Sequence, residues 1–509
     1  MRTENSIKNV FWTTAAFGIN LIVNFIARKF FIEILGAEYN GLNSLLTSII
    51  SILSIAELGI GTTIIYYLYK PLHEKNKELI KSLMEFYKKS YRLIASIVLL
   101  LGLAIMPFLT SIIGEINIDI NIYIVYILFL LESVVSYLFS YKRSIIIADQ
   151  KERIIKYTHI GIILLMNVMQ IATLYLTKNY YVFLLIKILF TCLENIILAN
   201  IANRKYSFIK EKANSLPTGV RRGLTKKIRA MFYHQIGGFV VNGTDNIMIS
   251  IMFGVTEVGM YNNYFLIVTS IFGLIDGVFS GVTASIGNLL VAKNKKDSLS
   301  VYRGILGISY VLAIYITSTF CVCVQPLVRI WLGDAYIMSE LVVVVLAVYL
   351  YFKIMKLPTV AFKNAAGIFY EDRFVPIIES VVNIVASLIC AKIFGVSGII
   401  MGTIISTFVL YFGSYPFIVY KQVFAVSPVY YFRQHLTYSV LAIASSSFII
   451  LLSNIVILKN DILEIIKNLL ISTGVSVIVL TMLWCMNSDF SGITKNLSRR
   501  IMRRGKKDA

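Results

Sequence analysis

Charged residues are scarce in this sequence. Only 15% of its 509 residues are Asp, Glu, Lys or Arg, whereas 57% are hydrophobic, and the mean hydropathy is +0.77. A typical soluble domain has about 25% charged residues, so the composition excludes that class. The sequence predicts an all-α integral membrane protein, because no lipid-exposed backbone polar group can be left unpaired in a membrane.

Groups that carry catalysis or bind metals are also rare. The four His do not pair at metal-ligand spacing, no glycine-rich phosphate loop ends in Lys-Ser or Lys-Thr, and no nucleophile motif is present. The five Cys all fall inside predicted spans, where packing is their expected role. We therefore expect no enzyme activity, no cofactor and no metal site. A membrane glycosyltransferase or polysaccharide polymerase would need a sizeable external loop with catalytic charges, and no such loop is predicted.

Hydrophobic stretches of about 20 residues predict about fourteen membrane-spanning helices. The first stretch is not followed by a cleavage site, so we expect it to be a retained helix. The predicted spans are residues 10–32, 42–68, 93–113, 122–147, 157–176, 181–201, 231–253, 264–291, 302–324, 340–355, 375–394, 399–420, 438–458 and 467–485.

Lys and Arg are distributed unevenly between the two sides of the predicted helices. With Met1 placed in the cytoplasm, all but eight of the 48 Lys and Arg residues lie on or beside cytoplasmic segments. Such an excess is the strongest signal of orientation in a membrane sequence. It predicts that both termini are cytoplasmic, and it accounts for the net charge of +21 without a nucleic-acid partner.

Two basic stretches on the predicted cytoplasmic side have apolar residues at helical spacing, residues 78–92 and 493–504. Either stretch is an interfacial helix that lies on anionic lipid or an ordinary positively charged loop.

The two halves of the sequence contain a weak internal repeat. A shift of 218 residues pairs Gly36 with Gly254, Gly41 with Gly259 and Asn24 with Asn242. Repeated halves are a recurrent transporter architecture. We predict a six-helix lobe at residues 1–215, a second at 216–430 and two additional helices with a basic tail at 431–509. The lobes would be related by a pseudo-two-fold axis around a central cavity.

Polar side chains inside the predicted spans are candidate functional residues, because an ionisable group there costs roughly 2.5 to 3.5 kcal/mol. Two stripes of them, in the first and seventh spans, are predicted to line a hydrated cavity. The alternative is interhelical hydrogen bonding in a packed interface. The candidates for substrate binding are Asn20, Asn24, Arg28, Lys29, Lys187, Gln235, Asn242 and Asn246.

Six carboxylates inside the predicted spans are candidates for ion coupling. Each either pairs with another buried charge or contacts a substrate or ion. Two of them, Glu57 and Asp276, occupy nearly corresponding positions in the two halves. The six are Glu57, Glu132, Glu194, Asp245, Asp276 and Glu379.

Several short motifs together resemble those of a known family. They are Ile34–Leu42, Ala56–Gly61, Asp245–Ser250, Phe253–Tyr261 and Asn364–Gly367. With spans arranged as six plus six plus two, the chain resembles the polysaccharide transporter branch (Wzx-type, O-antigen or capsule repeat-unit flippases) of the multidrug/oligosaccharidyl-lipid/polysaccharide exporter superfamily. The resemblance covers essentially the whole chain.

This resemblance implies a flippase in the bacterial cytoplasmic membrane. It would move an undecaprenyl-diphosphate-linked oligosaccharide from the inner to the outer leaflet by alternating access, for O-antigen, capsule or exopolysaccharide assembly. Arg28, Lys29 and Lys187 would face the diphosphate, and Asn24 and Asn242 the sugar hydroxyls. The implied partners are the lipid-linked oligosaccharide, membrane lipid, a coupling proton or sodium ion, and polymerase and chain-length proteins.

Three other functions remain open. A cation-coupled drug exporter of the multidrug and toxin extrusion branch usually has twelve spans, and a cationic drug would prefer a cavity dominated by Asp and Glu. A lipid II flippase of the same superfamily is the second alternative. The third is a non-transporting scaffold for a polysaccharide polymerase, which would have no water-filled path to Asn24 and Asn242.

Overall fold

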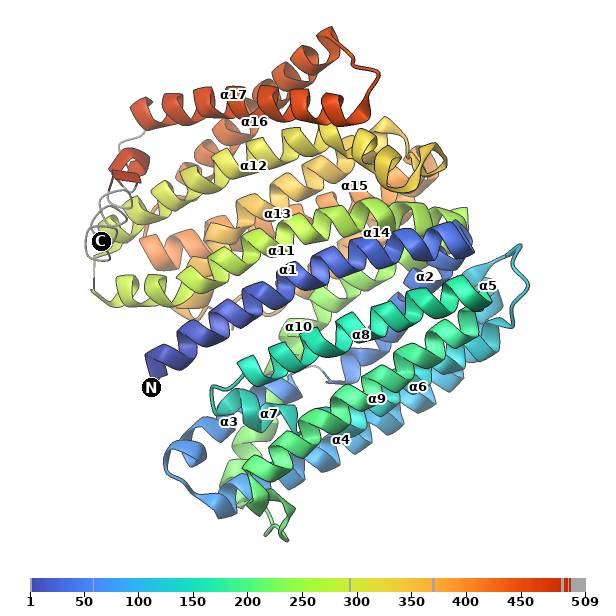
Figure 1. The fold of residues 1–509 in the computed structure, drawn as a ribbon. Coiled ribbons are helices and arrows are strands. Elements are labelled where there is room, and N and C mark those ends of the chain that lie inside the picture. The colour runs from blue at the N-terminus through green and yellow to red at the C-terminus, as the bar shows by residue number, and fades with distance from the viewer. Residues whose placement is uncertain are drawn as a thin grey trace, which may run out of the picture. The chain divides into compact units, whose positions relative to one another are not determined.

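The computed structural model describes residues 2–57, 59–292, 294–368, 371–486, 489–492 and 494–495 (Figure 1). Within these ranges the side chains of residues 2–10, 56, 230, 233–242 and 284 are not described. All the regular structure of the described residues is helical, which confirms the predicted all-α class.

The helices have the following bounds. The first half of the chain forms α1 (Arg2–Leu35), α2 (Ala37–Leu53), η1 (Ser54–Glu57), α3 (Ile60–His73), α4 (Lys77–Ile105), η2 (Met106–Phe108), α5 (Leu109–Ile113), α6 (Ile122–Ser140), α7 (Arg143–Ala148), α8 (Arg153–Thr177), α9 (Tyr180–Lys205), η3 (Ser207–Lys210) and α10 (Thr218–Phe253). The second half forms α11 (Val255–Ala292), α12 (Lys295–Leu332), η4 (Asp334–Tyr336), α13 (Glu340–Ala366), α14 (Val375–Phe394), α15 (Val396–Val409), η5 (Leu410–Phe424), α16 (Pro428–Ile455) and α17 (Asp461–Met486).

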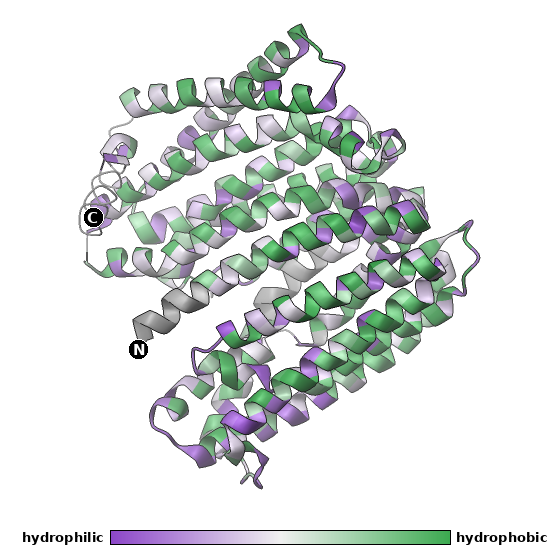
Figure 2. Ribbon diagram, in the orientation of Figure 1, coloured by the Kyte–Doolittle hydropathy of each residue, from purple (hydrophilic) through white to green (hydrophobic). Residues whose placement is uncertain are grey.

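In the described part of the chain, 12 helices are long and apolar enough to cross a membrane, so the protein is a multi-pass membrane protein. Figure 2 shows polar residues gathered at helix ends and in the connections between helices. These 12 helices correspond to all the predicted spans except the second and the seventh. The second span is divided into α2 and α3, of 17 and 14 residues, and the seventh, α10, is rich in polar residues.

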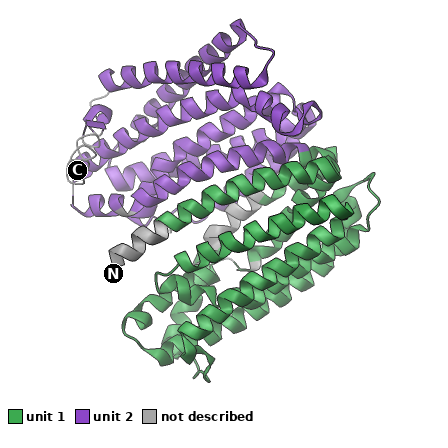
Figure 3. Cartoon of the chain, viewed as in Figure 1, with its two compact units in different colours: residues 1–259 green, residues 260–509 purple. Residues whose placement is uncertain are grey.

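The chain folds into two compact units, residues 1–259 and 260–509 (Figure 3). In unit 1, α1 packs along α8, α8 packs on α9, and α6 packs on both α4 and α9. α10 packs on α2, α3 and α5. An aromatic cluster joins α1, α2 and α9, with ring centroids 5.9 Å apart for Phe31 and Tyr180 and 5.2 Å apart for Tyr39 and Tyr180.

The repeated glycine turns adopt the same backbone conformation. Gly36, which precedes α2, has φ +96°, and Gly254, which precedes α11, has φ +91°. This conformation favours glycine, because a Cβ atom would be strained there. The two turns therefore agree with the shift that pairs Gly36 with Gly254 in the sequence.

Two further glycines of the repeat lie at a close contact between the starts of α2 and α11. A Cβ atom at Gly41 would lie 1.8 Å from the Val255 carbonyl oxygen, and one at Gly259 would lie 2.4 Å from the Ala37 carbonyl oxygen. Asn40 Nδ2 donates a hydrogen bond to the Gly259 carbonyl oxygen at 3.0 Å. The same shift relates Gly41 to Gly259 and Ala37 to Val255, so the contact is reciprocal.

In unit 2, α12 packs on α13, α16 and α17, and α15 packs on α14 and α13. The interior of this unit is rich in tyrosine. Tyr302 OH shares a hydrogen bond of 2.8 Å with Thr359 Oγ1, and the rings of Tyr310 and Tyr438 stack with centroids 4.4 Å apart. Further buried tyrosines are Tyr349, Tyr351, Tyr411, Tyr415, Tyr420 and Tyr431.

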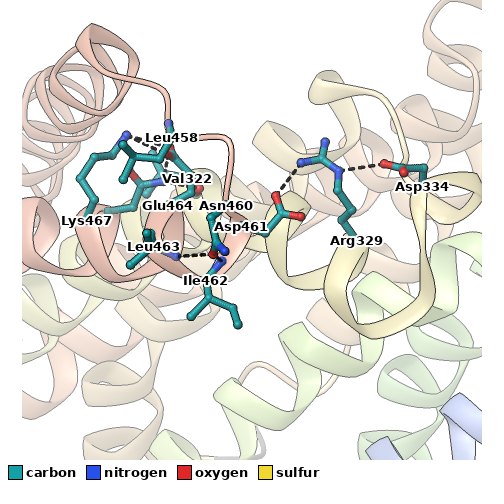
Figure 4. Close-up of polar contacts among 11 residues, drawn as sticks. Val322, Arg329, Asp334, Leu458, Asn460, Asp461, Ile462, Leu463, Glu464 and Lys467 are labelled. Carbon is teal, nitrogen blue, oxygen red and sulfur yellow. Dashed lines mark hydrogen bonds and ion pairs between the residues drawn. The ribbon is translucent and has the colours of Figure 1, made fainter.

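Of the two predicted additional helices, α16 and α17, the second is tied to α12 by a charged side chain (Figure 4). Arg329, near the end of α12, lies between Asp334 and Asp461, with nitrogen–oxygen distances of 2.8 Å to both. The pair of Arg329 with Asp461 fixes the start of α17 against α12. Lys467 pairs with Glu464 at 2.8 Å within α17 itself.

The basic stretch at residues 78–92 is the first part of α4, which continues into a predicted membrane span. Ile80, Leu83 and Met84 are buried inside unit 1, whereas Leu79 and Phe86 are half-buried. The stretch is therefore helical and not a loop, and its contact with lipid stays a prediction. The C-terminal stretch lies outside the described residues, apart from residues 494 and 495.

Candidate functional site

One irregularity inside a predicted membrane span is the break at Glu57. α2 ends at Leu53, η1 ends at Glu57, and α3 begins only at Ile60. Gly59 has φ +83°, and a Cβ atom on it would lie 2.6 Å from Met231 Cβ, so glycine is required there. Non-helical backbone at membrane depth is tolerated only where it is buried in protein or lines a cavity, and transporters place binding sites at such breaks.

Glu57 is held by neutral hydrogen-bond donors. Tyr91 OH donates to Glu57 Oε1, and Tyr87 OH donates to Tyr91 OH at 3.0 Å. A Cβ atom at Gly61 would lie 3.2 Å from Tyr87 OH, so this glycine leaves room for the tyrosine pair. In the part of the chain that the structure describes, no Lys, Arg or His forms an ion pair with Glu57. A carboxyl without a fixed counter-charge is suited to reversible protonation or cation binding.

Glu132 and Lys187, predicted for ion coupling and for substrate binding, form a pair with each other. Lys187 Nζ lies 2.8 Å from Glu132 Oε2, and Thr191 Oγ1 donates to Glu132 Oε1 at 3.4 Å. Lys187 also lies over the Phe129 ring, 5.1 Å from its centroid. In this conformation the charge of Lys187 is therefore balanced by a carboxylate of the same unit.

Glu194 lies at the centre of a second charged group, formed by α7, α8 and α9. Arg143 lies 3.2 Å from Glu194 Oε1, and His159 Nδ1 lies 3.1 Å from Glu194 Oε2. Arg143 also donates to Asn195 Oδ1 at 2.8 Å. Sequence reasoning missed these two basic partners, because Arg143 reads as an ordinary charge at the end of a span and His159 as an isolated histidine.

The polar stripe of the first span is partly open in the structure. Asn24 is exposed, whereas Asn20, Arg28 and Lys29 are half-buried, and Lys29 lies 3.8 Å from Glu33. Asn20 Oδ1 is buried and accepts no hydrogen bond from the described residues. An unsatisfied buried acceptor costs about 1 to 3 kcal/mol, so a donor on a ligand would stabilise it.

Of the polar stripe in the seventh span, the structure describes only the side chains after residue 242. Asn246 Nδ2 donates to Ser48 Oγ at 2.8 Å, and Asp245 is buried. At Asn246 the structure therefore shows the interhelical hydrogen bond that was the alternative to a cavity. The side chains of Gln235 and Asn242, which were also predicted to bind substrate, lie outside the described residues.

In unit 2 the two predicted carboxylates, Asp276 on α11 and Glu379 on α14, are both half-buried. Lys356 on α13, which sequence reasoning did not single out, interacts electrostatically with both of them. Its neighbour Lys353 lies over two aromatic rings, 4.4 Å from the Phe272 centroid and 5.0 Å from that of Tyr349. The ammonium group of Lys353 therefore contacts aromatic faces of the same unit.

Sequence reasoning also missed the buried ion pair of Lys363 with Asp372. Lys363 Nζ binds Asp372 Oδ2, and Ser414 Oγ donates to the same oxygen at 3.1 Å. Only 1% of Asp372 is exposed. The two residues lie at either end of a short connection between α13 and α14, so they read as loop charges.

The described polar interior offers hydrogen bonds and charges rather than a coordination site. Nowhere among the described residues do three or more His, Cys, Asp or Glu side chains converge in a way that would hold a metal ion. The arrangement suits the binding and release of polar groups or protons.

Comparison with known proteins identifies the fold. No protein-family model and no curated protein matches the sequence. The lipid II flippase MurJ, in its inward closed conformation, matches with a TM-score of 0.67 at 16% identity, over 93% of this chain and 99% of that one. The chain therefore has the two-lobe fold of the MurJ and MATE structures.

MATE structures share this fold over less of the chain. An inward-facing multidrug resistance MATE family transporter of the MOP superfamily matches with a TM-score of 0.58 at 13% identity, over 76% of this chain and 91% of that one. The Vibrio cholerae MATE transporter VcmN in the bent form matches with a TM-score of 0.53 at 12% identity, over 84% and 99%.

Proposed function

We propose that the protein is a flippase that moves a lipid-linked oligosaccharide from the inner to the outer leaflet of the bacterial cytoplasmic membrane, for surface polysaccharide assembly. The observation that carries this proposal is the extent of the MurJ match. The MurJ match leaves out 7% of this chain, which is fewer residues than α16 and α17 contain together. The match must therefore include part of these last two helices. The first MATE match leaves out 24%.

The first span supplies groups that suit such a substrate. A diphosphate needs cations, and Arg28 and Lys29 are adjacent on α1, while the amides of Asn20 and Asn24 can bind sugar hydroxyls. With the predicted orientation, the membrane potential also favours outward movement of an anion by about 2.3 kcal/mol per charge per 100 mV.

Glu57 is the carboxylate best placed to couple transport to a proton or sodium ion. Glu132 and Glu194 already have basic partners, whereas Glu57 has only tyrosine donors in the described structure and lies at a helix break. A change in its charge would act on the two short helices on either side of it. This role is independent of the identity of the oligosaccharide.

Complementation tests the proposal. The gene would be expressed in strains that lack their O-antigen or capsule flippase, and surface polysaccharide would be measured for the wild type, Arg28→Ala and the control Lys459→Ala, an exposed lysine between α16 and α17. We expect the wild type and Lys459→Ala to restore the polymer and Arg28→Ala to lose it at equal expression.

Failure of the wild type with several repeat-unit structures, at normal expression, would contradict the proposal. The specific alternative is then a cation-coupled drug exporter, in line with the MATE structures that share the fold. Resistance to cationic drugs in a sensitive strain would identify it. Restoration by Arg28→Ala would retain the flippase and exclude Arg28 as the phosphate ligand.

A further inference from the structure

A polar cavity of about 260 Å³ lies at one end of unit 1. It is formed by the first turns of α4, the junction of α6 and α7, the end of α9, and η3 with the residues after it (Figure 1). The distribution of Lys and Arg predicts that this end is cytoplasmic. Its lining residues are Lys81, Met84, Glu85, Lys88, Tyr141, Lys142, Asn203, Ile209, Lys210, Glu211 and Ala213.

Two of the four lysines in the lining already have carboxylate partners. Lys81 Nζ lies 2.6 Å from Glu78 Oε1 and 3.1 Å from Glu211 Oε2, which fixes the segment after η3 to α4. Lys88 lies 3.5 Å from Glu85 Oε2.

Lys142 and Lys210 form no ion pair with any described residue, although both line the same cavity. Lys142 is half-buried, and its burial and the charges of Lys88 and Lys210 lower its pKa. The positive charges around the cavity therefore repel one another. An anion between them would reverse the effect, because an opposite charge nearby favours the protonated amine.

Two neutral polar side chains of the lining add further hydrogen-bond donors to those of the lysines. Tyr141, with its phenol, and Asn203, with its amide, line the same cavity as Lys142 and Lys210. Phosphate oxygens accept hydrogen bonds from such groups, and charged donors make the stronger bonds. The cavity has room for a group of this size, since a water molecule occupies about 30 Å³ in the liquid.

We propose that this cavity, the α4–α9 basic cavity, binds a phosphate group at the cytoplasmic surface of the membrane. The group is that of an anionic phospholipid head or a free phosphate. α4 runs from the cavity directly into a membrane span, so the cavity lies where lipid head groups are found. The bound phosphate would hold η3 against α4. The inference does not depend on the proposed transport function.

Thermal unfolding of the purified full-length protein in detergent micelles tests the proposal. Dioleoyl-phosphatidylglycerol, dioleoyl-phosphatidylcholine and sodium phosphate would each be titrated, with sodium chloride of equal ionic strength as the reference for phosphate. A ligand that binds the folded state raises the melting temperature as its concentration rises. We expect phosphatidylglycerol or phosphate to raise it, and phosphatidylcholine and chloride to raise it much less.

Two double variants then locate the effect. Lys142→Gln with Lys210→Gln removes the two unpaired lysines, and we expect the half-saturating concentration to rise roughly 30-fold, at about 1 kcal/mol per lysine. Lys75→Gln with Lys212→Gln removes the same charge from exposed positions that do not line the cavity, and it should change that concentration less than about twofold.

The outcomes separate the two sources of the phosphate. Stabilisation by phosphatidylglycerol alone identifies a lipid head group, and stabilisation by sodium phosphate identifies a free anion. In the wild type, equal increases in melting temperature with phosphatidylglycerol and phosphatidylcholine, and no increase with phosphate, would overturn the proposal. Equal losses in the two double variants would also overturn it, since diffuse charge would then explain the binding. If the glutamine variant does not fold, Lys142→Arg with Lys210→Arg must retain the stabilisation.

Discussion

The two units of this protein fill their interiors with different chemistry. Unit 1 buries carboxylates that meet partners on other helices, as Glu132 meets Lys187 and Glu194 meets Arg143. Unit 2 buries many tyrosine rings among its aliphatic side chains, and some of their hydroxyl groups bond to neutral oxygens, as Tyr411 OH does to the Phe352 carbonyl oxygen at 2.9 Å. Aromatic rings need no counter-charge, whereas each ionised group inside a membrane protein does.

The comparison indicates in which unit the charge of interior side chains can change. A tyrosine core is held by many ring contacts and has few groups whose charge can alter. The charged pairs of unit 1 depend on the protonation of single carboxylates, and Glu57, beside its helix break, forms no ion pair with a basic residue in the described structure. We therefore expect transport to respond to changes in unit 1 and stability to respond to the core of unit 2.

The largest effect is expected at the buried ion pair of unit 2. Asp372→Leu leaves Lys363 buried without its counter-charge, which typically costs 3 to 5 kcal/mol, while a double change with Lys363→Met should recover most of the loss. Thermal unfolding in detergent measures both. The unit 1 counterpart, Glu132→Leu, should cost less because Lys187 is 30% exposed. Equal losses in the two units would remove the distinction between their cores.

The reciprocal glycine contact should respond at both of its ends. Gly41→Ala and Gly259→Ala each place a methyl group against a carbonyl oxygen, and each should destabilise the protein by about 1 to 3 kcal/mol. Gly161→Ala on α8, where a Cβ atom meets nothing within 4 Å, is the control and should not destabilise it. The measurement is again thermal unfolding. Tolerance of alanine at one position and not at the other would contradict a reciprocal contact.

Neutralising Glu57 should affect transport more than stability. Glu57→Gln keeps an acceptor for Tyr91 but removes the ionisable group, so we expect roughly a tenfold loss of transport, about 1.4 kcal/mol, with little change in melting temperature. Reconstituted transport and thermal unfolding measure the two properties. Full activity of Glu57→Gln would move the coupling role to another carboxylate.

The smallest effect is expected at the exposed tether between α12 and α17. Arg329→Gln breaks two ion pairs of a side chain that is 42% exposed, and such pairs each contribute about 0.2 to 1 kcal/mol. Faster hydrogen exchange at the start of α17 should be the clearest sign. Lys70→Gln, which breaks a more exposed pair with Glu74 in unit 1, is the matched control and should change exchange only locally. Unchanged exchange in Arg329→Gln would show that α17 is held by apolar packing alone.

The sequence predicted several residues of the candidate site, but not the side chains that contact them. The sequence identified Glu57, Glu132 and Glu194 because a carboxylate within an apolar helix is a local anomaly. It did not identify Tyr91 or Arg143 as their partners, because those residues are ordinary in their own segments. Asp372 was missed for the same reason, since only the fold around it makes it buried.

The sequence by itself determined the helical class, twelve of the fourteen predicted spans and the repeated glycine turns, because hydrophobic length and the conformational needs of glycine are local properties. Only the tertiary structure decided that the second span breaks at Glu57, that Lys187 is neutralised by Glu132, and that lysines from α4, α6–α7 and η3 share one cavity. These features depend on contacts between segments far apart in the chain, which no local pattern encodes.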